Sequence, residues 1–253
     1  MNDSSASASR PVLMLIPGMT NTPRVFDRLR PHLGPQVEIR VTDVRGPADI
    51  QSMARQVWSE LADVAPDRTL LLSGFSMGGY VLLQMLAEPA RRVDGIAVLC
   101  SSAHPERAEA VPMRERAIAS AERDWPRYVD RIGEFLIGDI ARQDASLREA
   151  ILADLLAAGA EATVAQMRAV IARPDQRPLL SRLNMPALVV AAERDPLIPV
   201  ADVRALAEAI PGAIAEVIPG AGHLVPWEHP DALGRILRAW VGRCINASPV
   251  RHP

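Results

Sequence analysis

Short, mainly apolar runs alternate with amphipathic stretches along most of the chain, and runs of this length are typical of strands buried on both faces. The runs predict strands at residues 12–16, 38–44, 69–73, 95–100, 187–191 and 213–218. Between them the pattern predicts helices: apolar residues recur three or four positions apart in some segments, and the segment after residue 76 is apolar all round. These helices are expected at residues 23–33 and 50–64, directly after residue 76, and at 203–210 and 233–244. The alternation predicts an α/β fold, with a mainly parallel sheet of about six strands and helices on both faces.

The alternation stops in one long stretch, residues 104–183. This stretch is helical in pattern, is rich in Ala, Arg, Glu and Leu, and has no strand-like run. An insertion of this size between two strands should lie on top of the sheet, at the carboxyl ends of the strands, where parallel sheets carry their ligand sites. We therefore expect a core of residues 11–103 and 184–246, a helical cap of residues 104–183 after the fourth strand, a disordered tail of residues 1–10 and a second tail of residues 247–253.

Composition and charge exclude several classes of protein. The chain has 253 residues, of which 49% are hydrophobic and 23% are charged, ordinary values for a globular protein. The net charge of −2 offers no basic surface for nucleic acid, and two cysteines are too few for a disulfide framework in a chain of this size. The uncharged stretch 69–87 could span a bilayer by length, but its Gly and Ser residues break it into a strand, a turn and a helix. Because the amino end also lacks a signal-peptide core, we expect a cytoplasmic protein that binds neither nucleic acid nor membranes.

A Gly-x-Ser-x-Gly motif, GFSMG, follows the third predicted strand and contains Ser76. An apolar strand runs into the motif and an apolar helix runs out of it. This is the context in which a strained turn exposes a nucleophilic serine at the edge of a sheet. An ordinary glycine-rich turn would fit the motif alone, so the context favours Ser76 as a nucleophile.

A serine nucleophile needs a general base and a carboxylate that orients the base. His223 follows the last predicted strand and Asp195 follows the strand before it, so both side chains should emerge at the same edge of the sheet as Ser76. We therefore predict a catalytic triad of Ser76, Asp195 and His223. Glu193 and Asp202 are the alternatives for the carboxylate; Glu193 lies nearer the strand, and Asp202 lies in the helix that follows.

The other histidines and one cysteine have simpler interpretations. His32 and His252 are expected at the solvated surface, and His229 in a structural turn. His104 opens the insertion, where it either lines a pocket or lies in a surface loop. Cys100 ends a strand and is expected to be a small, buried, apolar residue.

Acyl transfer also needs donors for the negative charge that develops on the carbonyl oxygen. The backbone N–H of Met77, the residue after the nucleophile, is one expected donor. The second is expected from the loop after the first strand, and we assign it to the N–H of Met19 in the sequence Pro-Gly-Met. A simple turn at this position would look the same in the sequence.

Together these motifs resemble the α/β-hydrolase superfamily over roughly residues 11–244. The segments that carry the likeness are PGM at 17–19, GFSMGG at 74–79, ERDPLIP at 193–199 and PGAGHLVPWEHP at 219–230. The resemblance implies cleavage of an ester, thioester, lactone, amide or carbon–carbon bond, with no metal ion and no organic cofactor. The sequence departs from the family pattern in three ways. Pro17 stands where most members have His, the loop after the second strand is reduced to residues 43–46, and the usual antiparallel strands do not precede the first parallel strand.

These observations favour a serine hydrolase that cleaves a small or medium carboxylic ester, with an apolar acyl or alcohol group, through an acyl-enzyme. The alternatives are a ligand-binding receptor that retains the triad, or a thioesterase, lactonase, carbon–carbon hydrolase or acyltransferase that uses the same serine. The insertion supplies no member of the triad, so we expect it to set substrate choice and not chemistry. Its expected apolar roof consists of Met113, Trp125, Tyr128 and Phe135. The sequence leaves the oligomeric state open.

Overall fold

The structure, a computed structural model, describes residues 10–247, and these contain one six-stranded sheet. Neighbouring strands all pair in parallel, in the order β2-β1-β3-β4-β5-β6. The strands are β1 Val12–Ile16, β2 Glu38–Val41, β3 Leu70–Phe75, β4 Gly95–Leu99, β5 Ala187–Ala192 and β6 Ile214–Ile218. The predicted parallel α/β sheet is therefore confirmed. The predicted tails, 1–10 and 247–253, lie outside the described residues except for Arg10 and Ala247.

The strand order brings several loops to one edge of the sheet. β1 pairs with β3 up to Ile16 and Gly74, and β3 pairs with β4 up to Phe75 and Leu99, so these central strands end at nearly the same level. Because all six strands run in parallel, the loops that follow them emerge at the same edge. This edge is where open α/β sheets carry their ligand sites.

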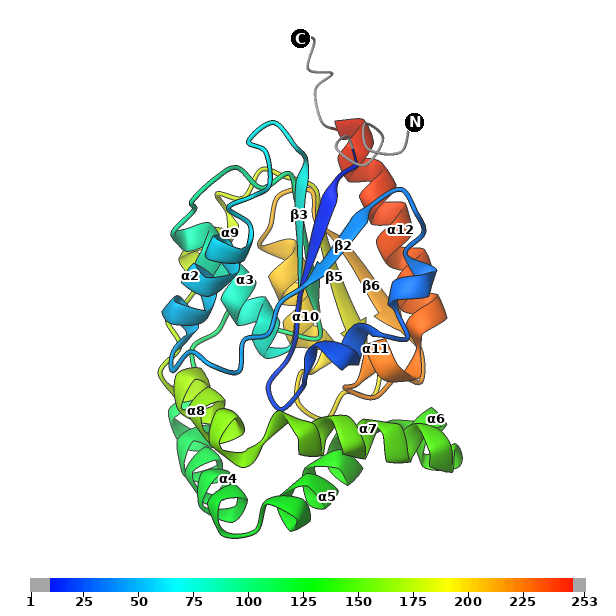
Figure 1. Ribbon diagram of the computed structural model, residues 1–253. Helices are drawn as coiled ribbons and strands as arrows, with labels where there is room; N and C mark the ends of the chain where they lie inside the picture. The colour runs from blue at the N-terminus through cyan, green and yellow to red at the C-terminus, as the bar shows by residue number, and fades with distance from the viewer. Residues whose placement is uncertain (1–9, 248–253) are drawn as a thin grey trace.

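Helices cover both faces of the sheet (Figure 1). One core contains the buried sides of α2 (Ile50–Glu60), α3 (Met77–Ala87) and α10 (Val200–Glu208). The core on the other face contains those of α11 (Val225–Glu228) and α12 (Pro230–Ala247). Since successive strand residues point to opposite faces, the central strands contribute to both cores, which explains their continuous apolar sequences.

The prediction of one helix at residues 23–33 is wrong. The structure has two short 3-10 helices there, η1 (Pro23–Phe26) and η2 (Arg30–His32). Pro31 contributes to the interruption, because it has no N–H to donate to the carbonyl of Asp27, a hydrogen bond that one continuous α-helix would need. Elsewhere the predicted ends of elements differ from the observed ends by a few residues.

Between β4 and β5 the described residues form helices and loops only, as the sequence predicts. The helices are η3 Ala108–Ala110, α4 Val111–Arg123, α5 Trp125–Leu136, α6 Asp139–Gln143, α7 Ala145–Ala158, α8 Ala160–Ile171 and α9 Arg177–Leu180. In Figure 1, α4 to α8 lie together below the sheet, whereas α9 lies beside the core helices. We call residues 104–183 the helical insertion; the division of the chain into a core and a cap stays a prediction.

No single helix within residues 10–247 is long and apolar enough to cross a membrane. α7 and α8 satisfy the criteria of length and composition only as a pair, and the pair is bent by 81°. The bend falls at Gly159, which has a φ of 85° and separates the two helices.

Candidate active site

Ser76 occupies the tight turn between β3 and α3. Its φ of 52° and ψ of −119° lie in a region that residues with a side chain seldom adopt. Two backbone hydrogen bonds hold the turn: Ser76 donates its N–H to the carbonyl of Leu99 at 2.8 Å, and its carbonyl accepts the N–H of Gly79 at 2.8 Å. Strained backbone of this kind is found where a fold holds a functional side chain in place.

Close backbone approach requires glycine on both sides of Ser76. A Cβ on Gly74 would lie closer than 3.0 Å to the carbonyl oxygen of Gly78, and a Cβ on Gly78 would lie closer than 3.0 Å to the carbonyl oxygen of Ile16. Real atoms do not approach so closely, so α3 can begin against the end of β1 only with these glycines. The motif therefore places Ser76 next to the loop that follows β1.

The structure brings together the three residues predicted as a triad. The Nε2 atom of His223 lies 2.9 Å from the Oγ atom of Ser76, and its Nδ1 atom lies 2.7 Å from the Oδ2 atom of Asp195. The side chains of His223 and Asp195 are only 4% and 1% exposed. A continuous chain of hydrogen bonds thus joins the hydroxyl, the imidazole and the carboxylate.

Further contacts fix the imidazole and the carboxylate. The Oδ1 atom of Asp195 accepts the N–H groups of Leu197 at 2.8 Å and Ile198 at 3.0 Å, so both carboxylate oxygens are bound. The ring of His223 packs against Phe75, with 5.3 Å between ring centroids. Neither side chain can rotate without breaking these contacts, which is the preorganisation that a positioned base needs.

The two predicted oxyanion donors lie on segments that flank Ser76. A Cβ on Gly18 would lie 3.1 Å from the Cβ atom of Ser76, so the loop after β1 runs directly beside the nucleophile. Met19 follows in this loop and packs against both cores. Met77 begins α3, and the first N–H groups of a helix have no partner within the helix.

The sequence did not indicate a role for three buried polar residues that contact the loops around the site. Glu228 in α11 accepts the N–H of Gly138 at 2.7 Å, and burial raises the pKa of its carboxyl to about 7. Asp154 in α7 and Gln166 in α8 are 0% exposed and bind the loop after β1. In the sequence each of these residues is only a polar residue among apolar neighbours, and this pattern does not indicate which group the side chain binds.

The alternative carboxylates have other partners. Glu193 accepts the N–H of Gly220 at 2.7 Å through its Oε2 atom. Asp202 forms an ion pair with Arg107 at 3.3 Å. Asp195 is thus the carboxylate that contacts His223.

The remaining histidines and Cys100 lie in different surroundings. His32 and His104 are half-buried, and His252 lies outside the described residues. The side chain of His229 is partly buried and burial lowers its pKa. Cys100 is buried, as expected, and burial together with the charge of Asp195 raises the pKa of its thiol well above the ordinary value.

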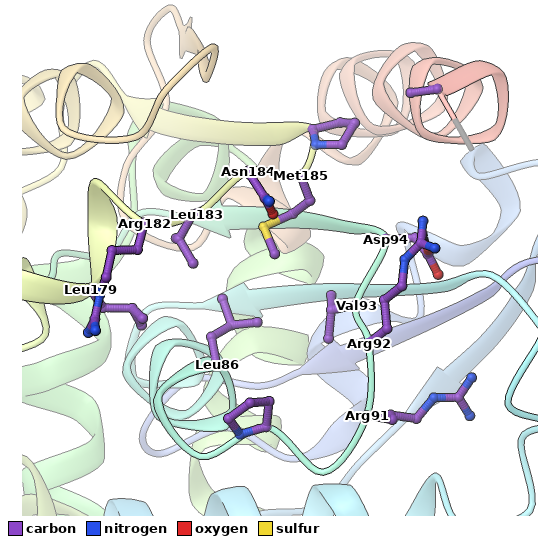
Figure 2. Close-up of a pocket in the computed structure, with 13 residues that line it drawn as sticks. Leu86, Arg91, Arg92, Val93, Asp94, Leu179, Arg182, Leu183, Asn184 and Met185 are labelled. Carbon is purple, nitrogen blue, oxygen red and sulfur yellow. Dashed lines mark ion pairs between the residues drawn. The ribbon is translucent and has the colours of Figure 1, made fainter. Parts of the chain in front are cut away.

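Within residues 10–247, no group of three or more His, Cys, Asp or Glu residues is placed to hold a metal ion. A groove of about 600 Å³ lies near the amino ends of β4 and β5, and Figure 2 shows its lining residues. Arg92 and Asp94 form an ion pair there at 2.7 Å. No member of the predicted triad lines this groove, which lies at the other edge of the sheet from Ser76.

Comparison with known proteins identifies the class. The chain matches the model of the alpha/beta hydrolase family over residues 13–236, and it belongs to this family. It is similar to the pimeloyl-[acyl-carrier protein] methyl ester esterase of Xanthomonas oryzae pv. oryzae, with 29% identity over 245 residues, 91% of this chain and 95% of the relative. It is also similar to the biotin biosynthesis bifunctional protein BioHC of Cellvibrio japonicus, with 27% identity over 237 residues and 89% of this chain. The chain spans about half of that relative, 46% of its length.

Among solved structures, the chain is similar to a thermophilic esterase from Thermogutta terrifontis. The TM-score is 0.86 and the identity 26%, over 93% of this chain and 91% of that chain. The predicted α/β-hydrolase fold and the predicted class of enzyme, an α/β-fold hydrolase, are confirmed.

Proposed function

We propose that the protein is a serine esterase that cleaves a small or medium carboxylic ester, with Ser76, His223 and Asp195 as its catalytic triad. The observation that carries the proposal is the hydrogen-bond chain from the Ser76 hydroxyl through His223 to Asp195. The names of the similar proteins support the choice of an ester as substrate.

In the first half of the reaction, the Oγ atom of Ser76 attacks the carbonyl carbon while Nε2 of His223 takes the hydroxyl proton. Asp195 holds the imidazole in the tautomer that leaves Nε2 free to accept, and it stabilises the imidazolium that forms. The N–H groups of Met19 and Met77 bind the oxyanion. Collapse of the tetrahedral intermediate breaks the ester bond, and His223 returns its proton to the leaving alcohol.

In the second half, His223 takes a proton from water, and the resulting hydroxide attacks the acyl-serine. The bond between the acyl carbon and Oγ breaks, Ser76 regains its proton from His223, and the carboxylic acid leaves. Apart from the water that is consumed, the chain's own side chains and backbone supply every group used in both halves. The proposal therefore includes no metal ion and no organic cofactor.

The proposed substrate is a small molecule in the cytoplasm with an apolar acyl or alcohol group. One similar protein is named for a methyl ester, which favours a small alcohol as the leaving group. The proposal includes no role for nucleic acid or membranes.

Labelling with a fluorophosphonate, measured by intact mass, tests the nucleophile. The wild type should gain one phosphonyl group, and Ser76→Ala should gain none. Turnover should then be measured with p-nitrophenyl esters and with methyl esters of increasing acyl length. Labelling of Ser76→Ala to the same extent as the wild type would contradict the assignment.

The same experiment separates the proposal from its alternatives. A receptor that retains the triad would react once and slowly with p-nitrophenyl esters, whereas an esterase turns over repeatedly. Faster turnover of matched thioesters or lactones than of open-chain oxygen esters would indicate one of the related hydrolases.

A further inference from the structure

Gln166 joins the helical insertion to the loops that follow two strands of the sheet. Its Oε1 atom accepts the backbone N–H of Thr20 at 3.0 Å, and its Nε2 atom donates to the carbonyl of Val44 at 3.4 Å. The side chain is 0% exposed, so no water competes for these bonds. One amide of α8 therefore binds both the loop after β1 and the loop after β2.

Thr20 has a backbone conformation that needs such support. Its φ of 61° lies in the left-handed region, which is unfavourable for a residue branched at Cβ. Thr20 is 2% exposed, so its N–H would be buried without a partner if the Gln166 oxygen were removed. We expect the loop to leave this conformation when the bond is lost.

A second residue of the insertion binds the same loop. The hydroxyl of Thr22 donates to the Oδ1 atom of Asp154 in α7, and this carboxylate is also 0% exposed. Two buried side chains of the insertion thus hold the loop on both sides of Asn21. The loop is held from the insertion as well as from the sheet.

The segment held in this way lies against the nucleophile. Gly18 lies beside Ser76, and Met19 separates Gly18 from Thr20. The bond to Thr20 orients the peptide between Met19 and Thr20, and thereby restricts the conformation of Met19. The direction of the Met19 N–H depends on that conformation.

We infer that Gln166 is a positioning residue for the oxyanion site, which it serves by fixing the Met19 N–H through Thr20. The inference rests on the proposed esterase function. It assigns a part of the chemistry to the helical insertion, in addition to the choice of substrate expected from the sequence.

Gln166→Met tests the inference, because Met has a similar length and volume but no comparable acceptor for the Thr20 N–H. Outright loss of an oxyanion donor lowers kcat about 10²–10³-fold, so a displaced donor should lower it about 10- to 100-fold. KM for a p-nitrophenyl ester should stay within about twofold, since the lost interaction belongs to the transition state. Circular dichroism and Tm show whether the variant is folded, and Gln166→Leu is used if it is not.

Thr163→Val is the matched control. Thr163 lies one turn earlier on α8, is 0% exposed, and its hydroxyl has no hydrogen-bond partner among residues 10–247. This change perturbs the same helix at the same depth without removing a hydrogen bond to the loop after β1. We expect its kcat to remain near that of the wild type.

Two further measurements distinguish positioning from general support of the fold. A trifluoromethyl ketone forms a tetrahedral adduct with an oxyanion on the serine, so its Ki should rise in Gln166→Met by the factor by which kcat/KM falls. Gln166→Glu keeps an oxygen for the Thr20 N–H, and it should retain several-fold more kcat than Gln166→Met.

Some results would overturn the inference while leaving the esterase in place. In each case the wild type hydrolyses esters and needs Ser76 to do so. The contradicting results are a kcat of Gln166→Met equal to that of Thr163→Val, an effect of Gln166→Met on KM alone, or equal losses of kcat in Gln166→Met and Gln166→Glu. A wild type without Ser76-dependent ester hydrolysis would instead overturn the proposed function, and the inference with it.

Discussion

The backbone N–H of His223 donates a hydrogen bond to the carbonyl of Leu136, the last residue of α5, at 3.0 Å. Two glycines allow this approach, since a Cβ on Gly222 or on Gly138 would lie closer than 3.0 Å to the backbone of the other. The helical insertion thus contacts the backbone that carries the imidazole. A movement at the end of α5 would displace His223 from Ser76.

Glu228 binds the backbone of Gly138 at this contact between the insertion and the His223 loop. From its pKa we predict that the stability of the protein depends on pH. Burial raises the pKa of its carboxyl from 4.5 to about 7, against the opposing effects of its bond from Gly138 and the nearby Arg142 and His223. Between these two pH values the folded protein holds a proton that the unfolded chain has released, so the free energy of unfolding falls as the pH rises. The contribution of the protonated Glu228 to the free energy of unfolding is fully present below about pH 4.5 and is lost as the pH rises through about 7.

Glu228→Gln removes this titration. Relative to the wild type, its free energy of unfolding should rise between about pH 4 and about pH 8, by at most about 3 kcal/mol. Urea unfolding at several pH values measures the difference. Parallel pH profiles for the two proteins would show that Glu228 does not titrate in this range.

Asp195→Asn should lower kcat by about 10⁴-fold without loss of the fold, as the equivalent change does in a serine protease. The Asn oxygen can still accept the N–H groups of Leu197 and Ile198, but its NH₂ group would then face Nδ1 of His223 and select the wrong tautomer. Steady-state kinetics with a p-nitrophenyl ester, together with Tm, measure both effects. Glu193→Gln and Asp202→Asn are the controls and should change kcat far less. A loss of kcat in Asp202→Asn as large as that expected for Asp195→Asn would mean that Asp195 is not the third member of the triad.

The sheet and the triad were predictable because their signals are local or follow from topology. A buried parallel strand is an apolar run, and Ser76, Asp195 and His223 each follow such a run directly. Parallel strands end at one edge, so the order of the elements alone brought the three side chains together. The helix expected at residues 23–33 is replaced by two 3-10 helices, since Pro31 lacks an N–H that one continuous helix would need.

The residues that hold the site could not be predicted in the same way. Gln166 and Thr20 are 146 positions apart in the sequence, and Asp154 and Thr22 are 132 apart. Glu228 binds an N–H that is 90 positions away. No spacing rule of a helix or strand connects such pairs, and two of the partners are backbone atoms, which carry no mark in the sequence.

Gly78→Ala should destabilise the protein by about 3 kcal/mol or more, because the added Cβ would meet the carbonyl oxygen of Ile16 and neither backbone can move easily. Gly242→Ala is the matched control: it lies within α12 and a Cβ there would have no atom within 4 Å. Since Ala favours the helix over Gly, this second change should stabilise the protein by about 0.5–1 kcal/mol. Urea unfolding of both variants gives the comparison, and equal effects of the two would show that α3 does not need glycine where it meets β1.

The apolar residues of the insertion differ in their contacts, and this predicts two kinds of variant. Trp125 stacks on Tyr128 with 5.7 Å between ring centroids, and its Nε1 atom donates to the carbonyl of Leu156, so this pair packs the insertion against itself. Phe135 and Met113 are 50% and 58% exposed. Trp125→Ala and Tyr128→Ala should therefore lower Tm, whereas Phe135→Ala and Met113→Ala should leave it nearly unchanged.

Phe135 is the best candidate for a specificity residue among these four, because it directly precedes Leu136. The carbonyl of Leu136 accepts the backbone N–H of His223. Phe135→Ala should change kcat/KM unevenly along a series of esters of increasing acyl length, by about 1–3 kcal/mol for a substrate that contacts the ring. Met113→Ala, which removes a similarly exposed side chain at the start of α4, shows the effect of lost surface alone. Phosphonate labelling of Ser76 should persist in both variants, since neither changes the triad. An unchanged chain-length profile in all four alanine variants would mean that these residues form no roof over the site, and the acyl pocket would have to be formed by other residues.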